Sequence, residues 1–156
     1  MRVIELSEAV GAENRAFATL LRKIGSEQMR APVDGKLTTK DILGHVAAYL
    51  EAERLALASG TGRAREAPIY FDDYQKWHEE EYDRRRGWTP GRIMAEVEEN
   101  SARYLSLVKS LHEEDLIKQV RFPWNETGTV HALILEGLKH RREHREELAA
   151  ALGLAG

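Results

Sequence analysis

Apolar residues recur every three or four positions through most of the chain, the spacing that places side chains along one face of an α-helix. A shorter and more exposed helix is expected between Phe71 and Arg86. The pattern predicts four long amphipathic helices: from about Ser7 to Met29, from Thr38 or Thr39 to about Gly60, onward from Thr89-Pro90, and from Thr129 to about Leu152. Four long helices with little strand signal predict an all-α fold, an up-down four-helix bundle with a long crossover between its second and third helices.

Length and composition exclude several classes of protein. The 156 residues fit one domain, residues 1–156, and the absence of Cys excludes disulfides, thiolate metal sites and a cysteine nucleophile. A net charge of −3 gives little support to nucleic-acid binding. The most apolar stretch, Val130–Leu138, is too short to span a bilayer, and the N-terminus lacks the pattern of a signal peptide. We therefore expect a cytoplasmic protein that binds neither nucleic acid nor membrane.

Two histidines interrupt the inward stripe of the fourth helix. Leu133, Gly137 and Leu148 follow the alternating four- and three-residue steps of a bundle seam, and His140 and His144 occupy the steps between them. The two lie one turn apart, so both imidazoles can reach one ion.

The second helix repeats this anomaly. His45 lies on a seam with Ile42, Tyr49, Ala52 and Ala56, where an apolar residue is expected. An unpaired imidazole in a core is costly, so each of the three histidines needs a partner. They could share one divalent metal, or each could be a hydrogen-bonded core residue. Imidazole ligands suit zinc or nickel first, and also iron or manganese.

The other polar candidates are weaker. Glu136 lies one turn before His140 and is our candidate catalytic residue for proton transfer, although it could equally be a carboxylate at the rim. His131 lies about half a turn away from His140 and cannot easily join the same ion. His78 and His112 stand among acidic residues, which predicts solvated side chains. Three tryptophans in or near the connections could line a pocket or cover the end of the bundle: Trp77, Trp88 and Trp124.

At these residues the chain resembles a known family. The segment Thr-Thr-Lys-Asp-Ile-Leu-Gly-His45-Val resembles the second-helix motif of the DinB/YfiT-like superfamily, and Leu-Lys-His140-Arg-Arg-Glu-His144-Arg-Glu-Glu-Leu resembles its last-helix motif. The middle of the chain is similar to the ClbS/DfsB-like branch. The resemblance implies a bundle with a long crossover, often a homodimer, that binds a divalent metal through His45, His140 and His144. Members include thiol-dependent transferases and isomerases and hydrolase-like proteins.

Two functions follow from these observations. The first is a metal-dependent enzyme, of hydrolase or thiol-transferase type, that acts on a small reactive or toxic molecule in stress or detoxification. Because the chain has no Cys, any thiol must be an external low-molecular-weight cofactor. The alternative is a non-catalytic protein of the same fold that sequesters a small molecule or forms a helical interaction dimer.

Overall fold

Four long helices form the body of the protein in the computed structural model, which describes residues 2–154. They are α1 (Val3–Lys23), α2 (Thr39–Gly60), α4 (Pro90–Ser110) and α5 (Val130–Leu152). A shorter helix, α3 (Tyr74–Arg85), lies in the link between α2 and α4, and two short 3₁₀ helices cover Gln28–Arg30 and Glu113–Ile117. Two small antiparallel hairpins complete the fold: β1 (Pro32–Asp34) with β2 (Leu37–Thr38), and β3 (Gln119–Arg121) with β4 (Thr127–Thr129).

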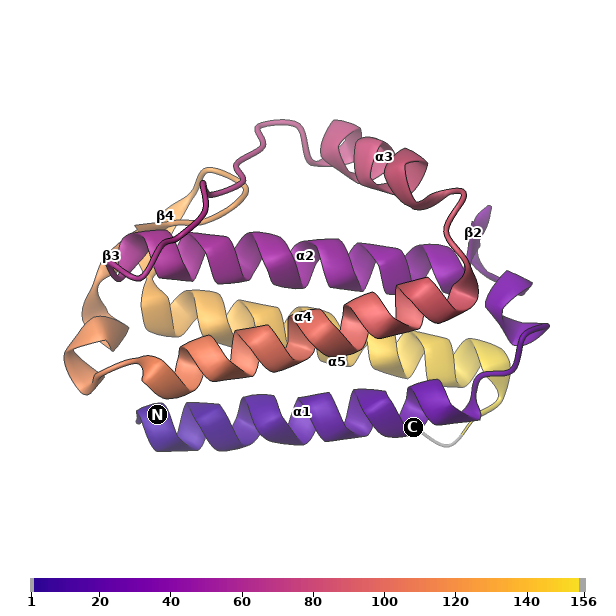
Figure 1. Ribbon diagram of the computed structural model, residues 1–156, viewed down its shortest axis with the longest axis horizontal. Helices are drawn as coiled ribbons and strands as arrows, with labels where there is room; N and C mark the ends of the chain where they lie inside the picture. The colour runs from indigo at the N-terminus through magenta and orange to yellow at the C-terminus, as the bar shows by residue number, and fades with distance from the viewer. Residues whose placement is uncertain (1, 155–156) are drawn as a thin grey trace.

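The long crossover follows from the direction of the helices. α2 and α4 run in one direction, and α1 and α5 run in the other (Figure 1). α2 packs against both α4 and α5, and α1 packs against the same two helices from the opposite side of the bundle. A helix of 22 residues is about 33 Å long. Because α4 is a parallel neighbour of α2, the chain must travel back along that length before α4 can begin, and residues 61–89 do so. The predicted bundle and its crossover are confirmed.

The starts of three helices lie where their sequence signals predict. Thr38 accepts a hydrogen bond from the Asp41 backbone N–H at 3.3 Å, and the Asp41 carboxylate accepts one from the Thr38 N–H at 2.8 Å. Thr89 and Thr129 cap α4 and α5 in the same way, at 3.2 and 3.0 Å. These caps fix which residues of α2 and α5 face the core.

The first helix departs from its predicted bounds at both ends. It begins at Val3 rather than near Ser7, because the Glu5 carboxylate accepts a hydrogen bond from the Arg2 backbone N–H at 3.3 Å. It ends at Lys23 rather than near Met29, because the next residue is extended and the chain then makes a separate 3₁₀ turn. The first β-hairpin occupies the Pro- and Gly-containing break that separates the first two predicted helices.

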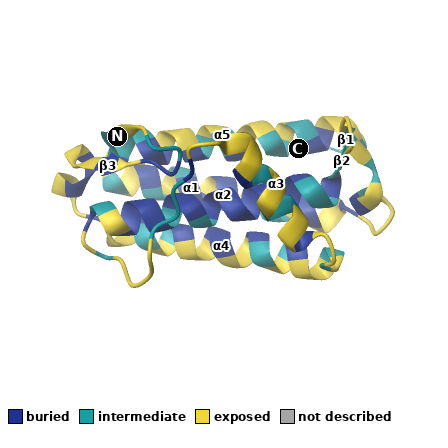
Figure 2. Cartoon of the chain, turned by 90° about the horizontal axis from the view of Figure 1, so that it is seen from above, coloured by how far each residue is buried: buried dark blue, intermediate teal, exposed yellow. Residues whose placement is uncertain are grey.

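Most of α2 is buried, because helices cover it on several sides. Figure 2 shows its dark blue surface beneath α3, which crosses the bundle on the outside. α3 is attached by Trp77, which is buried in a cluster with Phe71, Ala48 and Ala52. The crossover therefore forms an additional layer over the middle of α2. No helix among residues 2–154 has the length and apolar character needed to cross a membrane.

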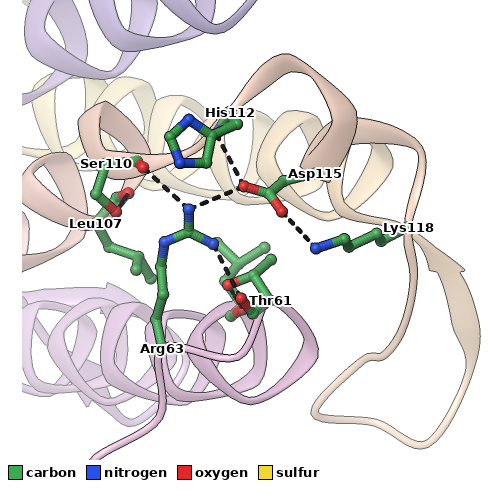
Figure 3. A network of polar contacts seen from close by, with 8 residues as sticks. Thr61, Arg63, Leu107, Ser110, His112, Asp115 and Lys118 are labelled. Atoms are coloured by element: carbon green, nitrogen blue, oxygen red, sulfur yellow. Dashed lines mark hydrogen bonds and ion pairs between the residues drawn. The ribbon is translucent and has the colours of Figure 1, made fainter.

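A polar network fixes the beginning of the crossover to the far end of α4 (Figure 3). The Arg63 guanidinium donates to the Ser110 carbonyl at 3.1 Å and pairs with the Asp115 carboxylate at 2.9 Å. Asp115 also accepts from Lys118 at 2.6 Å and from the His112 backbone N–H at 2.8 Å. Burial alone would raise the pKa of Asp115, but these donors outweigh it and lower the pKa to about 2. The network holds one end of the crossover, and the packing of α3 holds its middle.

Candidate metal centre

Three histidines from two antiparallel helices converge inside the bundle. His45 lies in the second turn of α2, and His140 and His144 lie one turn apart in α5. His140 Nε2 is 3.1 Å from His45 Nε2 and 3.1 Å from His144 Nε2. The three ligand nitrogens all lie within 4.8 Å of one another. Two nitrogens bound to one ion at the usual zinc–nitrogen length are about 2.9 to 3.4 Å apart, depending on the angle between them. The observed separations fit a shared ion.

Hydrogen bonding alone does not account for this convergence. A neutral imidazole nitrogen carries either one proton or one lone pair in the plane of the ring. His140 Nε2 therefore makes one well-directed hydrogen bond, but it has two histidine nitrogens at hydrogen-bond distance. An ion placed among the three nitrogens would use all three lone pairs at once. Of the two explanations for histidines on the seams, the geometry favours a shared cation over separate hydrogen-bonded core residues.

The protonation states also suit a metal. Burial, together with the positive charges that His140 and His144 would carry, lowers the pKa of His45 to about 2. Burial and the neighbouring His144 lower the pKa of His140 to about 3. Imidazoles must be neutral to bind a metal, and these two remain neutral across the physiological range.

These shifts predict an optimum in the pH dependence of stability for the metal-free protein. His45 and His140 bind protons in the unfolded chain below about pH 6.5 but not in the folded one, so stability falls as the solution becomes more acidic. Glu53 acts in the opposite direction, because burial raises its pKa to about 8. The folded state then holds one more proton on Glu53 than the unfolded chain does from about pH 4.5 to 8, and this contribution to stability falls as the pH rises through that range. Below pH 6.5 the two histidines outweigh it, so net stability falls with rising pH only above 6.5. Each group contributes up to about 1.4 kcal/mol per pH unit, so we expect maximal stability near pH 6.5.

Chemical denaturation of the chelator-treated protein at a series of pH values measures this optimum. Glu53→Gln is the matched variant, since it keeps the shape of the side chain but does not titrate. This variant should abolish the loss of stability above pH 6.5 and should keep the loss of stability below pH 6.5. Stability that is constant between pH 5.5 and 8 would contradict the prediction.

The outer contacts of the three rings differ. His144 Nδ1 lies 3.3 Å from Glu147 Oε1, an acceptor of the kind that orients metal-bound histidines. The Nδ1 atoms of His45 and His140 are buried and have no hydrogen-bond partner among residues 2–154. The His140 ring is instead held by stacking against Tyr49, with ring centroids 3.9 Å apart. Packing takes the place of hydrogen bonding in orienting this ring.

Two residues of α3 complete the site, and the sequence analysis missed both. The Tyr74 hydroxyl lies 3.1 Å from His45 Nε2, and the His78 ring lies 4.5 Å from the His45 ring. The prediction that His78 is solvated is wrong, because the crossover places α3 over the histidines. The four-residue spacing of Tyr74 and His78 puts both on one face of the helix, but the spacing does not show that this face meets α2.

Aromatic side chains form a wall beside the histidines. Trp77 stacks on Phe71 with centroids 4.4 Å apart, and Trp124 stacks on Tyr49 at 5.8 Å. Trp77 lies 6.4 Å from the His45 ring, whereas Trp88 precedes α4, packs against the main hydrophobic core and lies under the Arg92 guanidinium. The wall is contributed by α2, the crossover and the second hairpin, and its rings stack on one another.

Glu136 lies on α5 and is exposed, outside the group of three histidines. Its charge nevertheless reaches the site, because it is one of the causes that raise the pKa of Tyr49 and of Glu53. The remaining two histidines lie elsewhere. His131 is in the first turn of α5, and His112 follows α4, where its backbone donates to Asp115.

A buried carboxyl group lies two turns along α2 from His45. Glu53 is 1% exposed and accepts a hydrogen bond from the Tyr104 hydroxyl at 3.4 Å. It touches α5 at Gly137, where a Cβ atom would lie only 2.0 Å from Glu53 Oε2. Arg141 is 2% exposed and its charge partly offsets the effect of burial on Glu53. The absence of a side chain at Gly137 lets α2 and α5 approach closely, one turn from His140.

Comparison with known proteins agrees with this architecture. Residues 11–148 match the DinB superfamily. The chain belongs to the DinB superfamily. No curated protein matches its sequence. Among solved structures, this DinB-superfamily chain is similar to YfiT from Bacillus subtilis, described as a probable metal-dependent hydrolase with an unusual four-helix bundle topology, with a TM-score of 0.67 at 17% identity over 98% of this chain and 89% of that one.

Two other solved structures share the DinB-like fold. The mycothiol-dependent maleylpyruvate isomerase has a TM-score of 0.80 at 15% identity, over 95% of this chain and 61% of that one, so our chain spans about three-fifths of its length. The colibactin self-resistance protein ClbS, solved in complex with double-stranded DNA, has a TM-score of 0.74 at 12% identity, over 99% of this chain and 98% of that one. At these sequence identities the similarity shows a shared fold alone.

Proposed function

We propose that this protein is a divalent-metal-dependent enzyme whose ion is bound by His45, His140 and His144. The observation that carries the proposal is the pair of 3.1 Å contacts at His140 Nε2, which one shared cation explains and hydrogen bonds do not. The depressed pKa values of His45 and His140 support it, because they keep both imidazoles neutral. Zinc and nickel suit three imidazole ligands best, and iron and manganese are the alternatives.

Three protein ligands leave coordination positions open, as catalytic metal sites require. When bound, the ion would supply Lewis acidity and would lower the pKa of a water or thiol in an open position. The chain's own residues bind the ion and orient the histidine rings that hold it. The stacked Tyr49 fixes the His140 ring, Glu147 orients His144, and the covering helix α3 limits the access of water. Glu136 is the proposed proton carrier. It lies on the exposed side of α5, where its carboxyl group can exchange protons with solvent.

The proposed substrate is a small reactive or toxic molecule. Tyr49 and Trp77 are buried, so the half-buried Trp124 is the ring of this wall against which a planar or unsaturated group can pack. Hydrolysis and thiol transfer are the two reaction types that fit such a site. The probable hydrolase YfiT and the mycothiol-dependent isomerase, which share the fold, support this choice. A thiol, if used, is an external cofactor, because the chain has no Cys.

Metal analysis tests the proposal. Untagged protein purified without chelator should contain about one divalent ion per chain, or should take up one equivalent of zinc or nickel with micromolar or tighter affinity. Calorimetric titration of the chelator-treated protein measures the affinity. Protein that holds no stoichiometric metal and takes up none would overturn the proposal.

The aromatic wall also suits the alternative, a protein that sequesters a small molecule without converting it. His45→Ala separates the two. If the variant loses its metal but keeps ligand binding and the cellular phenotype, sequestration is the function. If the variant keeps ligand binding but loses the phenotype with the metal, catalysis is the function. The homodimer, the cytoplasmic location and the lack of nucleic-acid binding stay predictions, and the last needs a direct binding assay because ClbS was solved with DNA.

A further inference from the structure

Tyr74 is fixed at the first turn of α3 in front of His45. The Asp73 carboxylate caps this turn by accepting from the Lys76 backbone N–H at 3.0 Å. Three residues later, Trp77 is buried against Phe71 and attaches the helix to α2. Tyr74 itself is 43% exposed, so its ring lies at the edge of the site with one side toward solvent. Its position is thus set by the helix cap and the neighbouring tryptophan rather than by burial of its own ring.

The Tyr74 hydroxyl points at the nitrogen that would bind an ion. It lies 3.1 Å from His45 Nε2, the same separation as between the histidine nitrogens themselves. In the metal-free site this hydroxyl can donate to the lone pair of Nε2. A metal ion would take that lone pair, and the hydroxyl would then need another acceptor. An atom bound at the open coordination position of the ion would be the nearest acceptor for the Tyr74 hydroxyl.

We propose that Tyr74 is a ligand-positioning residue of this site, and that its phenol donates a hydrogen bond to the non-protein atom bound at the open coordination position. The ligand class is an anion or lone-pair donor such as hydroxide, a carboxylate or a thiolate. An ordinary tyrosine stays protonated at neutral pH and is therefore a donor there. The inference rests on the proposed metal site and adds a fourth protein group to it, from the crossover helix.

The cobalt(II)-loaded protein with azide as the probe ligand tests the role of Tyr74. Azide binding changes the visible absorption of cobalt, so the titration reports ligand affinity directly and needs no substrate. A hydrogen bond to a charged acceptor corresponds to a roughly 10- to 100-fold difference in affinity. We expect Tyr74→Phe to weaken azide binding about 10-fold or more while cobalt affinity changes less than about threefold, since the ring and its packing are kept.

Tyr70→Phe is the matched control, because it removes a hydroxyl from the same crossover at a ring that lies under Arg121. Its azide affinity should equal that of the wild type. An unchanged azide affinity in Tyr74→Phe would overturn the role of Tyr74 and leave the metal site intact. A loss of cobalt affinity equal to the loss of azide affinity would also overturn it, since Tyr74 would then support the site structurally. Wild-type protein that binds no cobalt would overturn both the metal site and this inference.

Discussion

His140→Ala should abolish stoichiometric metal binding. His140 Nε2 is the atom that both other histidine nitrogens approach at 3.1 Å, so its removal leaves His45 and His144 on different helices without a common neighbour. Changing a residue that only supports a ligand typically weakens metal affinity 10- to 100-fold, and removal of the ligand itself should exceed that. We expect the dissociation constant for zinc to rise at least about 100-fold. Calorimetric titration and the metal content of the purified protein measure the effect.

His131→Ala is the matched control for this experiment, because it changes a histidine on the same helix outside the cluster. It should retain wild-type metal content. His45→Ala and His144→Ala should each behave like His140→Ala. The shared-ion interpretation is wrong if any one of the three variants keeps wild-type affinity, since the remaining pair would then be sufficient.

The sequence was sufficient to predict the parts of the site that lie on long periodic helices. His45, His140 and His144 could be placed because each interrupts a regular apolar stripe, and the caps at Thr38 and Thr129 fix the faces of α2 and α5. Local signals of this kind depend on residues within one or two turns. The bundle and its crossover could be predicted for the same reason.

The contribution of the crossover could not be predicted from those signals. α3 is strongly polar, so its period does not indicate which face meets α2, and its position depends on the packing of Trp77 into a cluster built by distant residues. Tyr74 and His78 reach the site through that packing. Similarly, nothing in the sequence around Glu53 indicates that its carboxyl group is buried against Tyr104 on another helix.

Gly137→Ala should destabilise the protein, although alanine favours helices over glycine by about 1 kcal/mol. The added methyl carbon would lie 2.0 Å from Glu53 Oε2, which is far inside van der Waals contact. Glu53 is 1% exposed and cannot move away into solvent, so either its carboxyl group shifts within the core and loses the Tyr104 hydrogen bond, or α2 and α5 separate. Overpacking of this kind costs about 1–3 kcal/mol, which exceeds the gain from alanine, so we expect a net loss of about 1 kcal/mol and a decrease in Tm of about 2–4 °C. Thermal and denaturant unfolding measure it.

Gly91→Ala is the control for the helical effect of alanine, because a Cβ there meets no atom within 4 Å. It should be neutral or slightly stabilising.

A double variant identifies the cause of the loss. Glu53→Ala removes the group that the new methyl would strike, so Gly137→Ala should cost little in the Glu53→Ala background, with a coupling energy of about 2 kcal/mol. If α2 and α5 separate, His45 is drawn away from His140, one turn beyond Gly137. Metal affinity should then fall in Gly137→Ala and recover in the double variant as far as Glu53→Ala alone allows. Strictly additive free energies would show that Glu53 is not what limits the approach of the two helices.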